Sequence, residues 1–341
     1  MADRERVLSL INAAWTTQVI AAACELSIAD ALGDRSASSS DVATKVSASP
    51  DAVRRLLRAM TALRLCEEPA PDLYALTADG ASLRSDDPES LNAWARLSGG
   101  HLWRNWGTLA QSIATGESAR SRLDGTAGFE FLNEEADFAA LFNRAMVDLT
   151  RPVAQALARE LDWRGIARVV DVGGGRGEVL ATLLQTYPHM TGAVFDLAHA
   201  AGAARAWLST HGVADRSEII VGSFFDSMPA GADAYVLKSV LHNWSDASAR
   251  RILESCRAAM DREARVIVVE RIAPTRISDS PSDRDLVRSD LNMLVGCGGR
   301  ERTARQFDEL LGSAGLAVTS VSELVAGFSS IIAVPSQAPR A

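Results

Sequence analysis

The stretch Val169-Val170-Asp171-Val172-Gly173-Gly174-Gly175-Arg176-Gly177 decides the fold of this chain. It begins with apolar, β-branched residues, which are typical of a buried parallel strand. An acidic residue and a run of glycines follow, and residues 178–184 then have the apolar spacing of a helix. Glycines let the backbone pass close to a ligand. The stretch therefore predicts a strand, a ligand-binding turn and a helix, in that order.

The spacing of the glycines argues against a dinucleotide as this ligand. It is Asp-x-Gly-x-Gly-x-Gly, whereas the turn that holds a pyrophosphate has the spacing Gly-x-Gly-x-x-Gly. A second acidic residue, Asp196, ends the predicted strand Thr191 to Phe195, about 20 residues further on. Ligands of open α/β sheets bind at the carboxyl ends of the strands, where this carboxylate can accept hydrogen bonds from two ribose hydroxyls. An Asp at a strand end is also common as a helix cap or turn residue.

Composition limits the classes of protein that remain. A chain of 341 residues with 47% hydrophobic content is long enough for two domains. The net charge of −8 argues against a generic polyanion binder. No two of the four cysteines form a Cys-x-x-Cys pair, so we predict neither a zinc site nor a disulfide framework, and a reducing cytoplasm fits. We find no signal-peptide design and no apolar run of the ~20 residues that a membrane span needs.

The second half of the chain alternates short β-runs with helical segments, which indicates a parallel sheet of the α/β class. We expect a loop at Ser278 to Asp285. Seven strands are predicted, at Arg168 to Val172, Thr191 to Phe195, Glu218 to Val221, Asp233 to Leu237, Arg265 to Glu270, Gly315 to Val321 and Phe328 to Val334.

The first 90 residues predict a different, mostly helical unit. A long apolar helix is expected from Arg6 to Leu32, and residues 38–46 and 49–60 have the pattern of a helix-turn-helix. Leu73 to Thr77 would add one strand of a wing. Arginines on the second helix of this unit suggest DNA binding, but its apolar residues and acidic surroundings favour a dimerisation domain. Residues 91–158 are predicted to be helical, which divides the chain into segments 1–90, 91–160 and 161–341.

The glycine turn resembles motif I of the class I S-adenosylmethionine-dependent methyltransferases. Residues 222–229 with 235–246, residues 268–274 and residues 298–303 resemble further motifs of O-methyltransferases of small-molecule metabolism, of the plant caffeate and bacterial antibiotic-tailoring type. The resemblance covers essentially the whole chain. It implies a Rossmann-like seven-stranded methyltransferase sheet with an N-terminal winged-helix dimerisation domain. It also implies a homodimer, S-adenosyl-L-methionine as cofactor with S-adenosyl-L-homocysteine as product, and methylation of an aromatic hydroxyl of a secondary metabolite.

His242 is the candidate general base. It follows the fourth predicted strand and precedes a helix capped near Ser245, so it can face the same edge of the sheet as the glycine turn. A phenol is a poor nucleophile until its proton leaves, and a histidine can take that proton near neutral pH. The resemblance implies that Glu270 and Glu301 flank and orient the imidazole. Without it, Glu270 is a residue of a strand end and Glu301 an acid at a helix start.

The resemblance also implies the cofactor-binding residues. It assigns Gly173 and Gly175 to the methionine portion, with Asp171 beside them, and Asp196 with Leu197 to the ribose. Ser223 and Phe224 are assigned to the adenine, and Lys238 to the rim near the adenosine. The family commonly has Asp in place of Ser223 and after the catalytic histidine, where this chain has Asn243. No further histidine lies in the region that builds this rim, so no metal is predicted.

The acceptor cannot be identified from the motifs. Family position implies a pocket wall of six residues, namely Trp103, Phe142, Asn143, Met146, Asn292 and Met293. An alternative keeps fold and cofactor but methylates carbon or nitrogen, or uses the fold for a reaction other than methylation. A DNA-binding regulator that senses a small molecule is a third hypothesis. We expect a cytoplasmic enzyme with no nucleic-acid or membrane partner.

Overall fold

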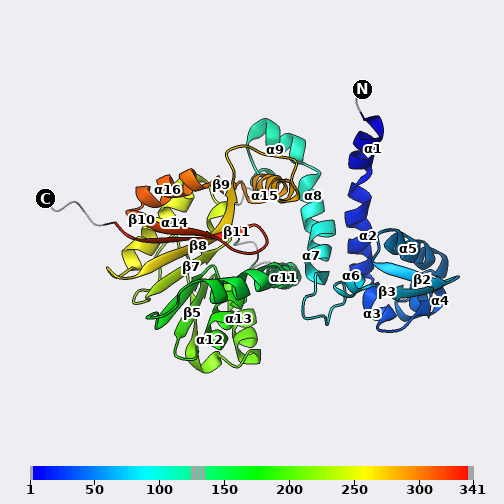
Figure 1. The fold of residues 1–341 in the computed structure, drawn as a ribbon, viewed down its shortest axis with the longest axis horizontal. Coiled ribbons are helices and arrows are strands. Elements are labelled where there is room, and N and C mark those ends of the chain that lie inside the picture. Colours follow the sequence, from blue (N-terminus) through cyan, green and yellow to red (C-terminus); the bar gives the residue numbers. More distant parts are fainter. Residues whose placement is uncertain (1–2, 124–128, 130–131, 133–134, 337–341) are drawn as a thin grey trace. The chain divides into compact units, whose positions relative to one another are not determined.

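The computed structural model describes residues 3–123, 129, 132 and 135–336. The chain forms two compact units, and each is described by itself. The N-terminal unit comprises Met1–Arg104 with Arg144–Leu149, and the C-terminal unit comprises Asn105–Asn143 with Thr150–Ala341 (Figure 1). The division into segments 1–90, 91–160 and 161–341 stays a prediction, and the two units divide the helical middle segment between them.

A single sheet forms the centre of the C-terminal unit, and its strands follow the order β10-β11-β8-β7-β4-β5-β6. The strands from β4 to β8 pair in parallel, whereas β11 is antiparallel to both β8 and β10. All seven predicted strands are present, and the short β9 (Arg302–Thr303), which we did not predict, pairs with β8. The seven strands are β4 (Arg168–Val172), β5 (Thr191–Asp196), β6 (Ser217–Val221), β7 (Ala234–Lys238), β8 (Arg265–Ala273), β10 (Leu316–Glu323) and β11 (Phe328–Pro335).

Helices cover both faces of this sheet. Val170 and Val172 belong to the hydrophobic core that includes α14 (Asp246–Ala259) and α16 (Ala304–Ser313). Val169, directly before Val170, belongs to a second core with α12 (Glu178–Thr186) and α13 (Ala198–Thr210). Figure 1 shows these two helix pairs on opposite sides of the strands. Successive strand residues point to opposite faces, so a central strand that is covered on both faces buries nearly all of its side chains.

Further helices of the C-terminal unit come from the middle segment and from the region after β8. They are α9 (Leu109–Thr115), α10 (Ala119–Leu123), α11 (Ala136–Glu160), whose residues 144–149 belong to the other unit, and α15 (Pro281–Cys297). The loop predicted at Ser278 to Asp285 is wrong in its second half, because α15 begins at Pro281. The Ser280 side chain caps this helix by accepting a hydrogen bond from the N–H of Asp283.

The N-terminal unit contains the predicted helix-turn-helix. Its two helices are α4 (Ser39–Lys45) and α5 (Pro50–Ala62), and the predicted wing strand is β3 (Leu73–Leu76). β3 lies between two strands that we did not predict, β1 (Ala37–Ser38) and β2 (Cys66–Ala70). The unit also contains α6 (Ala78–Ala81), α7 (Asn92–Leu97) and a π-helical turn at Ser98–Leu102, after which α8 (Trp103–Trp106) continues the chain into the C-terminal unit.

The long N-terminal helix predicted from Arg6 to Leu32 is wrong as one element. The segment forms α1 (Arg4–Asn12), α2 (Ala14–Glu25) and α3 (Ile28–Leu32). The first break is a tight turn, in which the N–H of Ala13 donates to the carbonyl of Leu10. At the second break, Ser27 has a left-handed backbone with φ of +54°. A non-glycine residue in that conformation ends a helix, because the next turn cannot continue.

The expectation that no apolar run is long enough to span a membrane needs a correction. Residues Arg4–Glu25 form a helical stretch of 22 residues that is long and apolar enough by length and composition alone. One such stretch near the N-terminus is weak evidence for a span, because core helices of soluble proteins have the same properties.

Two glycines in the C-terminal unit provide a test of its packing. A Cβ added at Gly192 would lie 2.4 Å from Cδ1 of Leu180 and 2.6 Å from the carbonyl oxygen of Val169, so Gly192→Ala should lower the free energy of unfolding by about 1–3 kcal/mol. The matched control is Gly202→Ala in α13, where the added Cβ has open space and should raise stability by about 0.5–1 kcal/mol. Urea denaturation measures both changes, and equal effects would contradict this packing.

Candidate active site

His242 lies where the sequence places it, directly after β7. The chain leaves β7 at Lys238, passes through Ser239 with a φ of +55°, and forms a 3-10 turn at Leu241–Asn243. The N-cap of α14 is Ser245, whose side chain accepts a hydrogen bond from the N–H of Ser248. The His242 side chain is only 13% exposed, so it faces the interior of the C-terminal unit. We call residues 239–244 the His242 turn.

Two carboxylates contact the same nitrogen of the His242 ring. Nδ1 lies 3.2 Å from Oε1 of Glu301 and 3.6 Å from Oε2 of Glu270. Within the described ranges, no hydrogen bond to Nε2 is found. A carboxylate can only accept, so Nδ1 must carry a proton, and neutral His242 then has its free electron pair on Nε2. The arrangement suits a proton acceptor at Nε2.

Both glutamates also accept hydrogen bonds from groups other than the imidazole ring. Oε1 of Glu270 accepts hydrogen bonds from the backbone N–H groups of Leu241, at 2.9 Å, and His242, at 3.3 Å. Oε1 of Glu301 accepts one from the hydroxyl of Ser289, at 2.7 Å. The N–H of Glu301 donates to Asp290. These contacts bring together three residues that are far apart in the sequence, as predicted for the catalytic group.

The pKa values of the two glutamates shift in opposite directions. Burial alone lowers the pKa of His242, but the charges of Glu270 and Glu301 and the hydrogen bond to Glu301 raise it above its ordinary value. Burial raises the pKa of Glu270, and His242 offsets only part of this. Burial also acts upward on the pKa of Glu301, but the hydrogen bond from His242 outweighs it and the pKa is lowered. Glu301 is therefore the partner that stays ionised beside a protonated imidazole.

The glycine turn has the backbone that its sequence requires. Gly173, Gly175 and Gly177 have φ values of +65°, +57° and +81°, a region that favours glycine. The N–H of Gly175 donates to Oδ2 of Asp196 at 2.7 Å, and the N–H of Leu197 donates to Oδ1 of the same residue. Asp196 thus links the ends of β4 and β5, as expected at the edge where parallel strands end.

Asp171 supports the glycine turn from below. Its side chain is 1% exposed and accepts a hydrogen bond from the N–H of Leu180. A Cβ added at Gly174 would lie 2.6 Å from Cγ of Asp171, so only glycine fits above this carboxyl. Burial raises the pKa of Asp171 to about 7. The structure gives Asp171 a supporting place, and a direct contact with the cofactor stays a prediction.

The residues predicted for adenine lie beside the glycine turn. A Cβ added at Gly173 would lie 3.9 Å from the Phe224 ring and 3.0 Å from the side chain of Val240, which precedes the 3-10 turn of His242. The Phe224 ring packs edge-on against Trp244, with centroids 5.9 Å apart. The hydroxyl oxygen of Ser223 accepts a hydrogen bond from the N–H of Phe225, so Ser223 also stabilises its own turn. Adenine binding by Ser223 and Phe224 stays a prediction.

Lys238 lies between the glycine turn and the glutamates. Its Nζ donates to Oγ1 of Thr150 at 3.0 Å and lies 5.1 Å from the centre of the Phe328 ring. Burial lowers the pKa of Lys238 to about 8, although the charges of Glu270 and Asp171 act in the opposite direction. These contacts tie α11 to the end of β7. The predicted place of Lys238 at the rim of the adenosine stays a prediction.

The six residues predicted for the acceptor pocket do not all belong to one unit. Trp103 and Met146 belong to the N-terminal unit, and the other four belong to the C-terminal unit. Phe142 packs against Phe129, with ring centres 5.9 Å apart, and Phe129 lies 6.3 Å from Trp244. The side chain of Asn143 is buried, Oδ1 of Asn292 accepts a hydrogen bond from Trp106, and Met293 precedes the end of α15. The wall as a set stays a prediction.

Sequence reasoning missed several residues of this site. Arg302 donates a hydrogen bond to the His242 turn, and Ser289 donates one to Glu301. Phe129 and Trp244 pack against each other near Phe142 and Phe224. For Arg302 the only signal was its position directly after Glu301. The departure at Asn243 is also explained, because its Nδ2 donates to the carbonyl of Ser239 at 3.0 Å, which an Asp carboxylate could not do.

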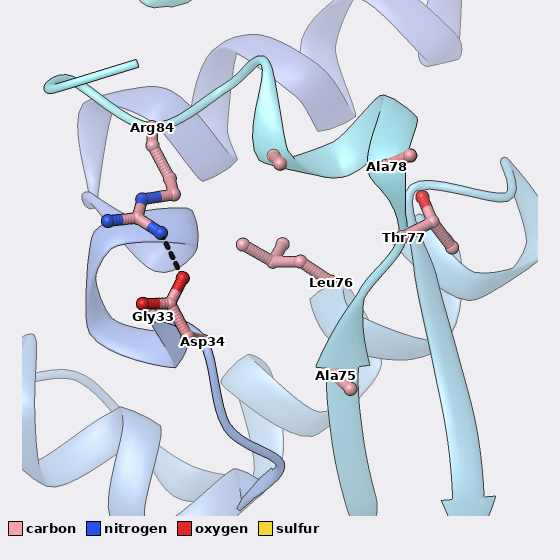
Figure 2. A pocket seen from close by; sticks show the side chains of 8 residues that line it. Gly33, Asp34, Ala75, Leu76, Thr77, Ala78 and Arg84 are labelled. Carbon is pink, nitrogen blue, oxygen red and sulfur yellow. Dashed lines mark hydrogen bonds and ion pairs between the residues drawn. The ribbon is translucent and has the colours of Figure 1, made fainter.

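The N-terminal unit has a hollow of about 300 Å³ that contains none of the predicted site residues (Figure 2). Arg84 lies at its edge, but Asp34 and Asp86 both pair with the guanidinium. The remaining lining is mostly small or apolar, with Leu76 and Thr77 from the end of β3. The hollow therefore offers no unpaired charge to a ligand.

Comparison with known proteins identifies the family. A model described as an O-methyltransferase domain matches residues 106–317, and one described as an O-methyltransferase dimerisation domain matches residues 8–85. The chain belongs to the O-methyltransferase family. Among its relatives is the O-demethylpuromycin-O-methyltransferase of Streptomyces alboniger, which is 38% identical over 320 residues, or 93% of this chain and 85% of that protein. The dimerisation match confirms the nature of the N-terminal unit.

Solved structures of O-methyltransferases confirm the fold. The crystal structure of LaPhzM superposes with a TM-score of 0.93 at 32% identity, and covers 98% of this chain and 100% of that one. The neocarzinostatin O-methyltransferase NcsB1 was solved with S-adenosylmethionine and 2-hydroxy-5-methyl naphthoic acid. It has a TM-score of 0.79 at 33% identity, over 94% of this chain and 96% of that one. The S-adenosylmethionine-dependent family predicted from the motifs is thus confirmed.

Other relatives are named for reactions other than O-methylation. The 8-amino-8-demethylriboflavin N,N-dimethyltransferase of Streptomyces davaonensis is 32% identical over 89% of this chain and 87% of that protein. The aclacinomycin 10-hydroxylase RdmB of Streptomyces purpurascens is 31% identical over 93% of this chain and 86% of that protein. Family membership alone therefore does not fix the acceptor atom, and the residues of the site must carry that argument.

The group of His242, Glu270 and Glu301 also has donors of the kind that bind metals, all within 4.8 Å of one another. Nδ1 already donates to Glu301, and a metal at that nitrogen would have to displace this hydrogen bond. We therefore keep the prediction that no metal is required.

Metal analysis of the purified protein tests this prediction. We expect well below one equivalent of zinc, iron or manganese, and unchanged S-adenosylmethionine binding after dialysis against a chelator, because the hydrogen bond to Glu301 already holds the imidazole in place. A stoichiometric metal that is lost on chelation, together with cofactor binding, would contradict it.

Proposed function

We propose that this O-methyltransferase transfers the methyl group of S-adenosylmethionine to an aromatic hydroxyl of a small-molecule secondary metabolite, with His242 as the general base. The observation that carries the proposal is the pair of glutamates on Nδ1 of His242, which leaves Nε2 as the proton acceptor. The relatives support the acceptor class, since they include a 3-amino-4-hydroxybenzoate 4-O-methyltransferase and a 2,7-dihydroxy-5-methyl-1-naphthoate 7-O-methyltransferase.

The glycine turn fits an adenosyl cofactor. Gly173 and Gly175 have positive φ angles, and an added Cβ would lie 3.0 Å from Val240 at Gly173 and 2.6 Å from Asp171 at Gly174. The Asp196 carboxylate lies beside the turn at the end of β5. When bound, S-adenosylmethionine supplies a methyl group on a positively charged sulfur. Asp196, with Leu197 behind it, would hold the ribose, and Phe224 the adenine.

His242 prepares the acceptor for methyl transfer. Nε2 takes the hydroxyl proton while the acceptor oxygen forms its bond to the methyl carbon, and the methyl–sulfur bond breaks with its electron pair left on sulfur. The imidazolium formed in this step is stabilised by ionised Glu301 and by Glu270. The proton then leaves to solvent. A positioned base of this kind contributes typically about 10²–10⁴-fold to the rate.

The N-terminal unit supports a homodimer. Apolar side chains on α1 and α2 are strongly exposed, among them Ile11 at 67% and Trp15 at 45%. Exposed apolar patches of this kind mark protein interfaces. Four arginines suggested DNA binding, namely Arg54, Arg55, Arg58 and Arg64, and the first two both pair with Asp51. We propose a soluble, cytoplasmic homodimer without a nucleic-acid or membrane partner.

A second candidate function keeps the cofactor and changes the reaction. The relatives named as an N,N-dimethyltransferase and a hydroxylase favour it. The product of a reaction with methyl-labelled S-adenosylmethionine separates the two candidates. Label on oxygen supports O-methylation, label on nitrogen or carbon supports another acceptor atom, and an unlabelled product would mean that the methyl group is not transferred.

Asp196→Ala tests the cofactor site. The variant loses the carboxylate that we assign to the ribose and that accepts the Gly175 N–H, so we expect S-adenosylmethionine affinity to fall by about 1.5–3 kcal/mol in calorimetry. The matched control is Asp308→Ala on the exposed side of α16, which should bind like the wild type. Unchanged affinity in Asp196→Ala would remove Asp196 from the site.

His242→Ala tests the base. With the phenolic acceptor that gives the fastest wild-type methyl transfer, turnover should fall by about 10²–10⁴-fold, because the hydroxyl keeps its proton. S-adenosylmethionine binding should stay within a few-fold of wild type. The exposed His189→Ala is the control and should keep full turnover. Wild-type turnover in His242→Ala would exclude His242 as the base.

A further inference from the structure

Arg302 is one of the most deeply buried charged residues in the C-terminal unit. Its side chain is 1% exposed, although arginines are rarely buried without several partners. It lies on β9, which pairs with the end of β8 at Ile272. Glu270 lies on the same end of β8, and Glu301 directly precedes Arg302. Arg302 is thus fixed to the two elements that carry the glutamates of His242.

The Arg302 guanidinium donates hydrogen bonds to three residues of one short segment, residues 241–246. Nη1 donates to the carbonyl of Leu241 at 2.8 Å, and Nη2 donates to the carbonyl of Trp244 at 2.7 Å. Nε donates to Oδ1 of Asp246 at 2.9 Å. Leu241 and Trp244 flank His242 on its two sides. The guanidinium therefore forms hydrogen bonds to the backbone on both sides of the proposed base.

We propose that Arg302 is a positioning residue that sets the His242 imidazole against Glu301. This inference rests on the proposed function, in which His242 is the base. Arg302 and Glu301 are neighbours in the chain, so the guanidinium fixes the turn that carries Nδ1 at a set distance from the carboxylate that accepts its hydrogen bond. The two carbonyl contacts are made by different nitrogens of one rigid plane, which fixes orientation as well as distance.

Gly299 and Arg300, which precede Glu301, also contact the His242 turn. The N–H of Arg300 donates to the carbonyl of His242 at 2.8 Å. A Cβ added at Gly299 would lie 2.0 Å from that carbonyl oxygen, so the segment before Glu301 passes directly over the turn. Asn243 adds a contact within the turn through its Nδ2 and the Ser239 carbonyl. Arg302 is the only one of these residues whose side chain bridges both flanks of His242.

Lysine in place of Arg302 is the informative substitution. It keeps the positive charge beside Asp246 but has a single nitrogen, which cannot reach both carbonyls with the geometry of the guanidinium. If Arg302 served only as a buried counter-charge, Arg302→Lys would leave the imidazole where it is. If it positions the turn, the contact between Nδ1 and Glu301 loosens. The matched control is Arg305→Lys, an exposed arginine paired with Glu309 on α16.

Nuclear magnetic resonance of ¹⁵N-histidine-labelled protein reads this contact without any acceptor. The chain has five histidines, and His242→Gln assigns the signals of His242. In the wild type we expect neutral His242 to be protonated at Nδ1 and to titrate above its ordinary value. In Arg302→Lys, Nδ1 and Nε2 should share the proton and the pKa should move down, because the hydrogen bond to Glu301 that raises it is weaker. Arg305→Lys should match the wild type.

Two outcomes decide the inference. A shifted tautomer and pKa of His242 in Arg302→Lys, with S-adenosylmethionine binding retained and turnover lower by roughly 10- to 100-fold at similar KM, supports it. Wild-type His242 signals in Arg302→Lys overturn it. Wild-type turnover in His242→Ala would instead refute the proposed base, whereas the signals of His242 report its position independently of turnover.

Arg302→Gln keeps the inference testable if circular dichroism shows that Arg302→Lys does not fold. Glutamine leaves no unpaired positive charge in the interior, and its single amide nitrogen cannot donate to the carbonyls of Leu241 and Trp244 with the spacing of the guanidinium. The same change in the His242 signals as expected for Arg302→Lys supports the inference. Wild-type His242 signals in folded Arg302→Gln would overturn it.

Discussion

The hydrogen bond from Nδ1 of His242 to Glu301 is the interaction on which the site depends. It brings a turn after β7 against a segment near the far end of the chain, with Glu270 of β8 behind both. A buried imidazole beside two carboxylates is costly unless each charge is paired and hydrogen-bonded. The N–H groups of Leu241 and His242 and the hydroxyl of Ser289 provide these hydrogen bonds. The parallel sheet makes this possible, because its strands end at one edge.

The cofactor side depends on the same edge of the sheet. The glycine turn at the end of β4 and Asp196 at the end of β5 are joined by a backbone hydrogen bond, and Val240 before the 3-10 turn lies against Gly173. The charge of Lys238 acts on both groups of residues, because it lowers the pKa of Asp171 below the glycine turn and the pKa of Glu270 beside His242. The proposed methyl-donor site and the proposed base thus lie at the ends of neighbouring strands of one sheet, which favours a fixed in-line geometry.

Strands and motifs could be predicted from the sequence because their signals are local. The β-branched runs, the glycines from Gly173 to Gly177 and the position of His242 after β7 all follow from short patterns. The hydrogen bonds from Arg302 to two carbonyls could not be predicted, because they depend on which distant segments of the chain pack together. The break at Ser27 was missed because apolar spacing gives no sign of a left-handed residue. The six residues predicted for the acceptor wall are spread from Trp103 to Met293 in the sequence, so no local pattern identifies such a wall.

The pH dependence of methyl transfer in the wild type and in Glu301→Gln tests the central claim most directly. The carboxylate of Glu301 raises the pKa of His242, so wild-type kcat/KM should fall on acidification with a midpoint above about 6.5, as the base becomes protonated. In Glu301→Gln the midpoint should move to lower pH and the maximal rate should fall. An acid limb at the same pH in both proteins would contradict the account, because Glu301 would then not act on the base.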